Sequence, residues 1–393
     1  MNYADKINKR VSEMPQSGIR KFFDIASELD DCVSLGVGEP DFVTPWEIRD
    51  AAIKSIQAGR TQYTSNAGLL SLREEIALYL SSRFDARYDP KSEIIVTVGA
   101  SEAIDLSLRT LVSEGDEVLV PSPSYVSYAP SVRLAGGVPV PLNTSAEQEF
   151  KLTPELIEAA VTDKTKAIIL PYPNNPTGAI MTREELLRIS PVILKHDLMV
   201  ISDEIYAELT YGNRGHYSVA AVEGMRERTV LINGFSKAFA MTGWRLGYLA
   251  APVEIVSQIY KIHQYTIMCA STFSQVGGEA ALRIGREDGY RMVEEMRSAY
   301  DIRRRYLRSE LNKMGLNCFE PKGAFYVFPS VKCTGMSGDE FAERLLFSKR
   351  VAVVPGSAFG ESGRDFIRCS YATKLSDLKK AVARIKAFMC EIV

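Results

Sequence analysis

Residues 93–112 read EIIVTVGASEAIDLSLRTLV and join two different patterns. The run 93–99 is apolar and rich in β-branched residues, which predicts a buried strand. The run 100–112 carries apolar residues at helical spacing, which predicts a helix with one buried face. A buried strand that passes through a glycine into a helix is typical of a β-α-β unit.

The same alternation continues along the middle of the chain. Four further apolar runs read as strands, at 116–125, 166–173, 198–204 and 228–235, and 184–197 reads as a helix. The pattern predicts an α/β fold with a mostly parallel sheet and helices on both faces. Sheets of this kind bind ligands beyond the carboxyl ends of their strands. Four residues directly follow such runs: Gly99, Asn175, Asp203 and Ser236.

The pattern of charged and apolar residues changes near residue 285. Residues 285–315 read as one long charged helix with an apolar stripe. Strand-like runs follow at 324–330 and 351–356, and then a C-terminal helix at 375–389. We therefore expect a large domain at 45–285 and a smaller α+β domain at 286–393. The segment 1–44, with a short strand-like run at 32–38, is expected to pack on the smaller domain.

Composition narrows the classes of function. The chain has 393 residues and a net charge of −2, whereas nucleic-acid-binding proteins usually have a basic excess. No uncharged apolar run approaches the roughly 18 residues of a membrane span, and the N-terminus lacks the apolar core of a signal peptide. The cysteines lie far apart without a C-x-x-C pair, and the histidines are scattered. We expect a cytoplasmic protein with reduced thiols and no metal site.

Gly99-Ala100-Ser101 lies where the first strand passes into its helix. Amide N–H groups at a helix N-terminus, together with a serine hydroxyl, can bind one phosphate. The alternative is a tight turn in which Ser101 caps the helix. The chain contains neither G-x-G-x-x-G at this turn nor G-x-x-x-x-G-K-[ST], so the motifs of dinucleotide and nucleoside-triphosphate sites are missing.

Two polar segments follow later strands. Residues 174–178 read NNPTG, which is either a plain turn or a turn that directs the Asn175 amide into a cleft. Asp203 follows an apolar run, where an unpaired carboxylate is costly to bury. A pyridinium N–H or a metal ion would provide the partner, and capping of a helix is the alternative. The phenol of Tyr206 lies three positions further on.

Lys237 lies in the segment 233–247, NGFSKAFAMTGWRLG. Burial among these apolar residues would lower the pKa of the amine and favour the neutral form, which reacts with carbonyl groups. Arg245, and Ser236 beside the lysine, could both bind the anion near Ser101. The alternative is a lysine that extends along the apolar surface into solvent.

An anion-binding turn, an acid, a phenol and a lysine in this order describe a site for pyridoxal phosphate (PLP), and the chain resembles the class I/II, fold-type I aminotransferases. The resemblance extends from SLGVGEPD (34–41) to Arg368 and is most specific in NNPTG and in SKAFAMTGWR (236–245). It implies a seven-stranded sheet and PLP as the cofactor. It also implies ping-pong transfer of an amino group between an L-amino acid and a 2-oxo acid, with 2-oxoglutarate and glutamate as one pair.

The resemblance also implies a role for each matching residue. Lys237 would form the internal aldimine and move the substrate proton, and Asp203 would keep the pyridine nitrogen protonated. Further contacts to the cofactor would come from Ala100, Ser101, Tyr125, Asn175, Tyr206, Ser236 and Arg245, and from Tyr63 of the partner in a homodimer with shared active sites. The substrate would contact Gly38, Asn175 and Arg368, whose guanidinium would hold the α-carboxylate.

Within the family, SGIRKF (17–22), YTSNAG (63–68) and KIHQY (261–265) look closest to the bacterial aminotransferase A type. That type is associated with aromatic amino acids and with N-acetyl-L,L-diaminopimelate. Ser101 stands where another prokaryotic subgroup carries a lysine, which argues against a strict aspartate specialist.

Two alternatives share the scaffold. A carbon–sulfur β-lyase of the cystathionine-cleaving type uses the same first step, the loss of the Cα proton. A transcription regulator with an aminotransferase-like sensor domain would need a DNA-binding domain ahead of it, and the stretch before Ser34 shows no helix-turn-helix pattern.

Overall fold

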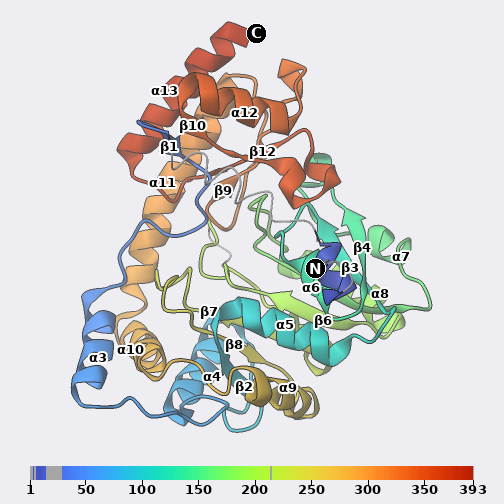
Figure 1. The fold of residues 1–393 in the computed structure, drawn as a ribbon, viewed down its shortest axis with the longest axis vertical. Helices are drawn as coiled ribbons and strands as arrows, with labels where there is room; N and C mark the ends of the chain where they lie inside the picture. Colours follow the sequence, from blue (N-terminus) through green and yellow to red (C-terminus); the bar gives the residue numbers. More distant parts are fainter. Residues whose placement is uncertain (1–2, 4–5, 15–28, 213–214, 393) are drawn as a thin grey trace.

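A seven-stranded sheet forms the centre of the molecule (Figure 1). The computed structural model describes residues 3, 6–14, 29–212 and 215–392. The strands are β2 (Ile94–Thr97), β3 (Glu117–Ser122), β4 (Val138–Asn143), β5 (Thr165–Leu170), β6 (Met199–Asp203), β7 (Thr229–Gly234) and β8 (Gly247–Ala250). Their order is β2-β8-β7-β6-β5-β3-β4, and β8 runs antiparallel to both of its neighbours while the other pairs are parallel. The predicted α/β fold with a mostly parallel sheet is confirmed.

Helices cover both faces of this sheet, because successive strand side chains point to opposite faces. The helices are α3 (Trp46–Gln57), α4 (Leu70–Phe84), α5 (Gly99–Leu111), α6 (Tyr128–Leu134), α7 (Pro154–Glu158), α8 (Arg183–Lys195), α9 (Val253–Thr266) and α10 (Thr272–Asp288). Ile95 and Ile169 pack in one cluster with α5, α6 and α9. Ile94 packs with α4 and α10, and Ile168 packs with α7 and α8. Burial on both faces explains why the inner strands read as continuous apolar runs, whereas the residues of the edge strand β4 are mostly exposed or half-buried.

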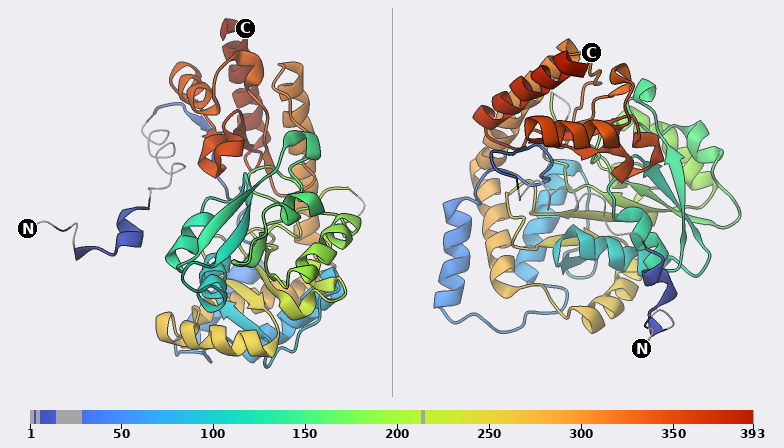
Figure 2. Two further views of the ribbon diagram at one scale, coloured as in Figure 1. Left: turned by 90° about the vertical axis from the view of Figure 1, so that its right-hand side faces the viewer. Right: turned by 45° about the horizontal axis from the view of Figure 1, so that its top comes forward.

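A second group of elements gathers at one end of the molecule, as both views of Figure 2 show. It contains α11 (Arg291–Lys313), β9 (Tyr326–Val327), α12 (Gly338–Lys349), β10 (Val351–Ala352), β11 (Val354–Pro355), β12 (Ile367–Ser370) and α13 (Leu375–Ile392). The strands β11, β12 and β9 form a small antiparallel sheet. The N-terminal strand β1 (Val33–Ser34) pairs in parallel with β10, and the short helix α1 (Lys9–Ser12) precedes it.

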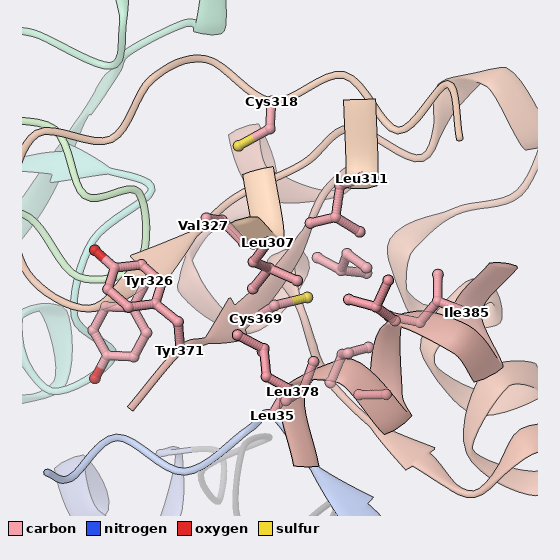
Figure 3. Packing of buried hydrophobic residues seen from close by; sticks show 14 of the residues in the cluster. Leu35, Leu307, Leu311, Cys318, Tyr326, Val327, Cys369, Tyr371, Leu378 and Ile385 are labelled. Atoms are coloured by element: carbon pink, nitrogen blue, oxygen red, sulfur yellow. The ribbon is translucent and has the colours of Figure 1, made fainter. Parts of the chain in front are cut away.

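The second group has its own apolar core (Figure 3). Leu307 and Leu311 of α11 lie near Cys369 of β12, and α13 contributes Leu378 and Ile385. Leu35, which follows β1, is buried in the same core. Residues 33–35 are therefore anchored to the C-terminal elements by packing as well as by strand pairing. The helix α1, in contrast, lies on α6, and Arg10 pairs with Glu114.

The prediction of one long helix over 285–315 is wrong. The helix α10 ends at Asp288 and α11 begins at Arg291. Between them Gly289 and Tyr290 adopt left-handed conformations, with φ of 72° and 57°. The Tyr290 ring packs on Gly285, where an added Cβ would lie 2.4 Å from the ring. A left-handed glycine is a common helix end, and the apolar stripe alone did not indicate this break.

The predicted division of the chain into segments at 1–44, 45–285 and 286–393 stays a prediction. The boundary at 285 falls inside the last turn of α10. The strand-like run 351–356 forms two short strands, β10 and β11, rather than one. None of the helices in the described part of the chain has both the length and the apolar character needed to span a bilayer.

Candidate active site

A cavity of about 350 Å³ lies at the carboxyl ends of the central strands. Its walls come from the start of α5, from the segments after β5, β6 and β7, and from β9 and β12. Most of the site residues predicted from the sequence line this one cavity: Gly38, Ala100, Ser101, Tyr125, Asn175, Asp203, Tyr206, Ser236, Lys237, Arg245 and Arg368. The chain therefore places an amine, an acid, hydroxyl groups and two guanidinium groups around one space.

Lys237 follows β7 and is held by the N-terminal part of the chain. Its Nζ donates a hydrogen bond to the Gly38 carbonyl at 2.7 Å. Burial lowers the pKa of Lys237 to about 8. The Glu39 carboxylate acts against this shift, whereas the guanidinium groups of Arg368 and Arg245 add to it. The neutral fraction of the amine near neutral pH is therefore larger than that of an ordinary lysine, and the neutral form is the nucleophile for a carbonyl.

Asp203 is the last residue of β6 and is 5% exposed. One carboxylate oxygen accepts a hydrogen bond from the Tyr128 hydroxyl at 2.7 Å, and the other accepts from the Ile205 amide at 3.1 Å. Burial raises the pKa of Asp203, and the bonds from Tyr128 and Ile205 oppose that shift. The structure thus supplies donors that favour the ionised acid in a buried place, where a protonated ring nitrogen would be a matching partner.

The start of α5 and Arg245 come together at one side of the cavity, where amide groups and a guanidinium could bind an anion. Gly99 has φ of 75°, and an added Cβ would lie 2.7 Å from the Arg245 guanidinium. An added Cβ at Gly247 would lie 2.6 Å from the Ala100 amide nitrogen. The two glycines therefore allow β8, the helix start and the arginine to approach closely. Val98, not Ser101, is the N-cap of α5, so the capping alternative for Ser101 is wrong.

Arg368 of β12 is 3% exposed and only partly paired. Its guanidinium donates to the Asn175 side-chain oxygen at 2.9 Å and to the Gly36 carbonyl at 2.5 Å. It lies over the Tyr326 ring at 4.4 Å, and its Nε has no hydrogen-bond partner although it is buried. A buried donor without a partner fits an anionic ligand. Because the Asn175 oxygen accepts from Arg368, its amide nitrogen is left to donate to a ligand.

Tyr326 of β9 connects the remaining parts of the cavity. Its hydroxyl lies 3.0 Å from the Tyr206 hydroxyl. An added Cβ at Gly38 would lie 2.7 Å from the same oxygen. A glycine is needed at position 38 because any side chain would meet the Tyr326 hydroxyl. Burial raises the pKa of Tyr206 well above its usual value, so this phenol stays a hydrogen-bond donor at neutral pH.

The structure does not place every predicted residue in the cavity, and two tyrosines that were not assigned a role do lie there. Tyr63 does not line the cavity of its own chain and is 81% exposed. The segment 17–22 lies outside the described residues. Tyr128 and Tyr326 also line the cavity, and the sequence analysis assigned no role to either. The only local signal for either was an aromatic residue beside a predicted strand end.

Replacing Tyr128 by phenylalanine tests its contact with Asp203. The variant removes a hydrogen bond to a charged group, a loss that corresponds to about a tenfold effect or more. That bond lowers the pKa of Asp203, so its removal raises this pKa further. We expect the acid limb of the pH–rate profile to move to higher pH and kcat to fall about tenfold. Tyr125→Phe is the matched control, and an unchanged acid limb in Tyr128→Phe would contradict the assignment.

The comparisons with known proteins identify the class of enzyme. The chain belongs to the class I and II aminotransferases, because the model of that family matches residues 30–385. Enzymes of this class depend on PLP, and the protein is a PLP-dependent aminotransferase that acts on amino acids and 2-oxo acids.

Three similar proteins are named after three different substrates. The chain is 46% identical to the aspartate aminotransferase of Pyrococcus abyssi over 98% of each chain. It is 44% identical to a Bacillus subtilis protein named "Probable N-acetyl-LL-diaminopimelate aminotransferase", over 98% of this chain and 95% of the relative. The crystal structure of an aromatic aminotransferase from Pyrococcus horikoshii matches with a TM-score of 0.90 and 45% identity, over 95% of this chain and 99% of that chain.

The residues around the cavity fit PLP. The unpaired Arg368 Nε, the buried Asp203 and the glycines beside Arg245 are the kinds of group that an anionic, aromatic cofactor and an amino acid require. When bound, PLP supplies an aldehyde that combines with amines and a ring that withdraws electrons. The alternative of a carbon–sulfur lyase is not favoured, since the relatives are named as aminotransferases.

Proposed function

We propose that the protein is a cytoplasmic, homodimeric aminotransferase that takes the amino group of an aromatic L-amino acid, with 2-oxoglutarate and glutamate as the second pair. The observation that carries the proposal is the single cavity that contains Lys237, Asp203 and Arg368. Six free cysteines among the described residues are in keeping with a reducing compartment.

The residues predicted from the sequence have the following tasks in this proposal. Arg368 holds the α-carboxylate of the substrate through a charge-assisted bond. Lys237 moves a proton between the substrate Cα and the cofactor, a task for which its lowered pKa is suited. Asp203 keeps the ring nitrogen protonated, and Tyr206 and Asn175 donate to the phenolic oxygen. Ser101, Ser236, Arg245 and the Ala100 amide bind the phosphate, and Tyr125 stacks on the ring.

The preference for an aromatic side chain follows from the charges around the cavity. Among the described residues that line it, the cationic ones are Lys237, Arg245 and Arg368. All three are already assigned to the cofactor or to the α-carboxylate of the substrate. Ser101 stands where another prokaryotic subgroup carries a lysine, so this position offers no cation for a carboxylate on the substrate side chain. The remaining walls include Tyr326 and Ile104, which favour an apolar or aromatic side chain.

The homodimer is supported by exposed apolar side chains. Tyr63 and Tyr265 are 81% and 86% exposed, and Ile267 and Met268 are also exposed. These residues come from two segments that His263 and Asn66 join by a hydrogen bond. Large exposed aromatic groups on neighbouring segments are typical of a protein interface. In the proposed dimer, Tyr63 reaches the phosphate site of the partner.

A half-reaction screen tests the substrate. Holoenzyme is mixed with single L-amino acids, and loss of the absorbance of bound pyridoxal phosphate is followed without any 2-oxo acid. We expect phenylalanine, tyrosine and tryptophan to react faster than aspartate. A preference for N-acetyl-L,L-diaminopimelate, the candidate suggested by the Bacillus subtilis relative, would replace the aromatic assignment. Release of pyruvate from cystathionine in the same assay would instead support the assignment as a carbon–sulfur lyase.

A further inference from the structure

We propose that His263 is a positioning residue that joins the phosphate-binding start of α5 to the loop carrying Tyr63. His263 lies on α9 and lines no part of the cavity described above. Its side chain is 0% exposed, and that of its partner Glu102 is 10% exposed. The inference rests on the proposed homodimer, in which Tyr63 serves the phosphate site of the partner.

The contacts form one continuous chain of hydrogen bonds. The Val98 amide donates to one oxygen of Glu102, and the other oxygen lies 2.7 Å from His263 Nδ1. On the far side of the ring, His263 Nε2 lies 2.8 Å from the Asn66 carbonyl oxygen. Val98 and Glu102 flank the phosphate-binding residues 99–101, and Asn66 lies three positions after Tyr63. The His263 imidazole therefore contacts both the segment at the start of α5 and the segment that carries Tyr63, which are the two proposed sources of phosphate contacts.

The hydrogen-bond partners of His263 determine which of its ring nitrogens carry a proton. A carbonyl oxygen only accepts, so His263 Nε2 must carry a proton. Glu102 accepts from the Val98 amide in the first turn of a helix, a place where an ionised carboxylate is stabilised. Nδ1 then donates to this carboxylate, which makes the pair an imidazolium and a carboxylate with no net charge. Such a buried pair is costly to break from one side, because the remaining charge loses its partner.

The loop that carries Tyr63 is held at further points. The Gln275 side chain accepts from the Leu69 amide at 2.7 Å and donates to the Thr64 hydroxyl at 3.0 Å. The Val96 amide donates to the Ala67 carbonyl at 3.0 Å. The Thr272 hydroxyl donates to the Gln62 carbonyl at 2.7 Å, so the chain is anchored on both sides of Tyr63 while the phenol itself is exposed. This is the arrangement expected of a side chain that must reach a fixed point on a second copy of the chain.

The test uses the full-length protein and compares two ligands. His263→Gln keeps a polar side chain of similar reach but cannot donate on both sides of a ring, and Glu102→Gln removes the charge from the partner. His196→Gln is the control, because His196 pairs with Glu158 at the surface. Cofactor-free enzyme is titrated with pyridoxal phosphate and with pyridoxal, which lacks the phosphate. We expect each of the first two variants to bind pyridoxal phosphate about tenfold more weakly and to bind pyridoxal unchanged.

A double-mutant cycle with Tyr63→Phe tests the link itself. If His263 acts through the Tyr63 loop, the losses of His263→Gln and Tyr63→Phe will not multiply. Equal weakening of both ligands, no weakening in either His263→Gln or Glu102→Gln, or losses that multiply would each overturn the proposal. If Tyr63→Phe alone leaves pyridoxal phosphate binding unchanged, the shared site of the proposed dimer fails together with the link. If Tyr63→Phe weakens binding and His263→Gln does not, only the role of His263 fails.

Discussion

Replacing Lys237 by alanine is expected to abolish transamination while the protein stays folded. The side chain is the only amine lining the cavity among the described residues, and its Nζ is held at 2.7 Å from the Gly38 carbonyl. Without this amine, no group of the chain in that position can take the substrate proton. The loss of general-base catalysis alone should lower the rate by about 10²–10⁴-fold. Loss of the covalent bond to the cofactor adds to this effect. Steady-state assays with an aromatic donor and 2-oxoglutarate measure the result.

Lys237→Arg provides the matched control for this experiment. Arginine keeps a positive charge of similar length but does not lose its proton in proteins, so it cannot act as a base. Both variants should therefore be inactive, although their melting temperatures should stay close to that of the unmodified protein. Retained turnover in Lys237→Ala would show that another group carries the proton, and the assignment of the site would fail.

Asp203→Asn is expected to reduce kcat by about 10²–10⁴-fold, in the range of a lost proton-transfer or charge partner. The amide cannot stabilise a protonated ring nitrogen, and it occupies the same space between Tyr128 and the Ile205 amide. The loss should appear mainly in kcat, because the proposed contacts to the phosphate and to the α-carboxylate are left in place. Single-turnover absorbance measurements separate this chemical step from binding.

Glu204→Gln is the control for Asp203, because it alters the adjacent buried carboxylate. Glu204 accepts from the hydroxyls of Ser202 and Ser218, each at 2.8 Å, and pairs with His216. It does not line the cavity. The substitution should lower thermal stability and leave kcat nearly unchanged. Equal losses of kcat at positions 203 and 204 would indicate a general defect in folding instead of a partner for the ring nitrogen.

The pattern of the sequence predicted five of the seven strands, because each of these is an apolar run followed by a helix or a polar turn. It missed β4, whose residues are mostly exposed or half-buried, and the short strand β8. It did not predict the strand order, which places β8 between β2 and β7. That order depends on packing between segments far apart in the chain. The break at Gly289 was missed for a related reason, since apolar residues continue at helical spacing on both sides of it.

The candidate residues of the site were predictable where a motif carried them. NNPTG and the segment around Lys237 are local, and the strand ends place them at one edge of the sheet. The contacts of Tyr128 and Tyr326 are not local. Tyr128 meets Asp203 across 75 positions and Tyr326 meets Tyr206 across 120 positions. Neither tyrosine has a spacing that distinguishes it from an ordinary core residue, so only the tertiary structure identifies it.

The pairing of Gly234 with Gly247 across β7 and β8 closes the loop that contains both Lys237 and Arg245. The span between Lys237 and Arg245, the arginine proposed to bind the phosphate, is thus set inside one loop with fixed ends. Arg368, in contrast, belongs to the small sheet of β9, β11 and β12. The proposed phosphate contacts and the proposed contact to the substrate α-carboxylate therefore come from different parts of the chain. Substitutions around β9, β11 and β12 should therefore alter how the α-carboxylate is held and leave the proposed phosphate contacts in place.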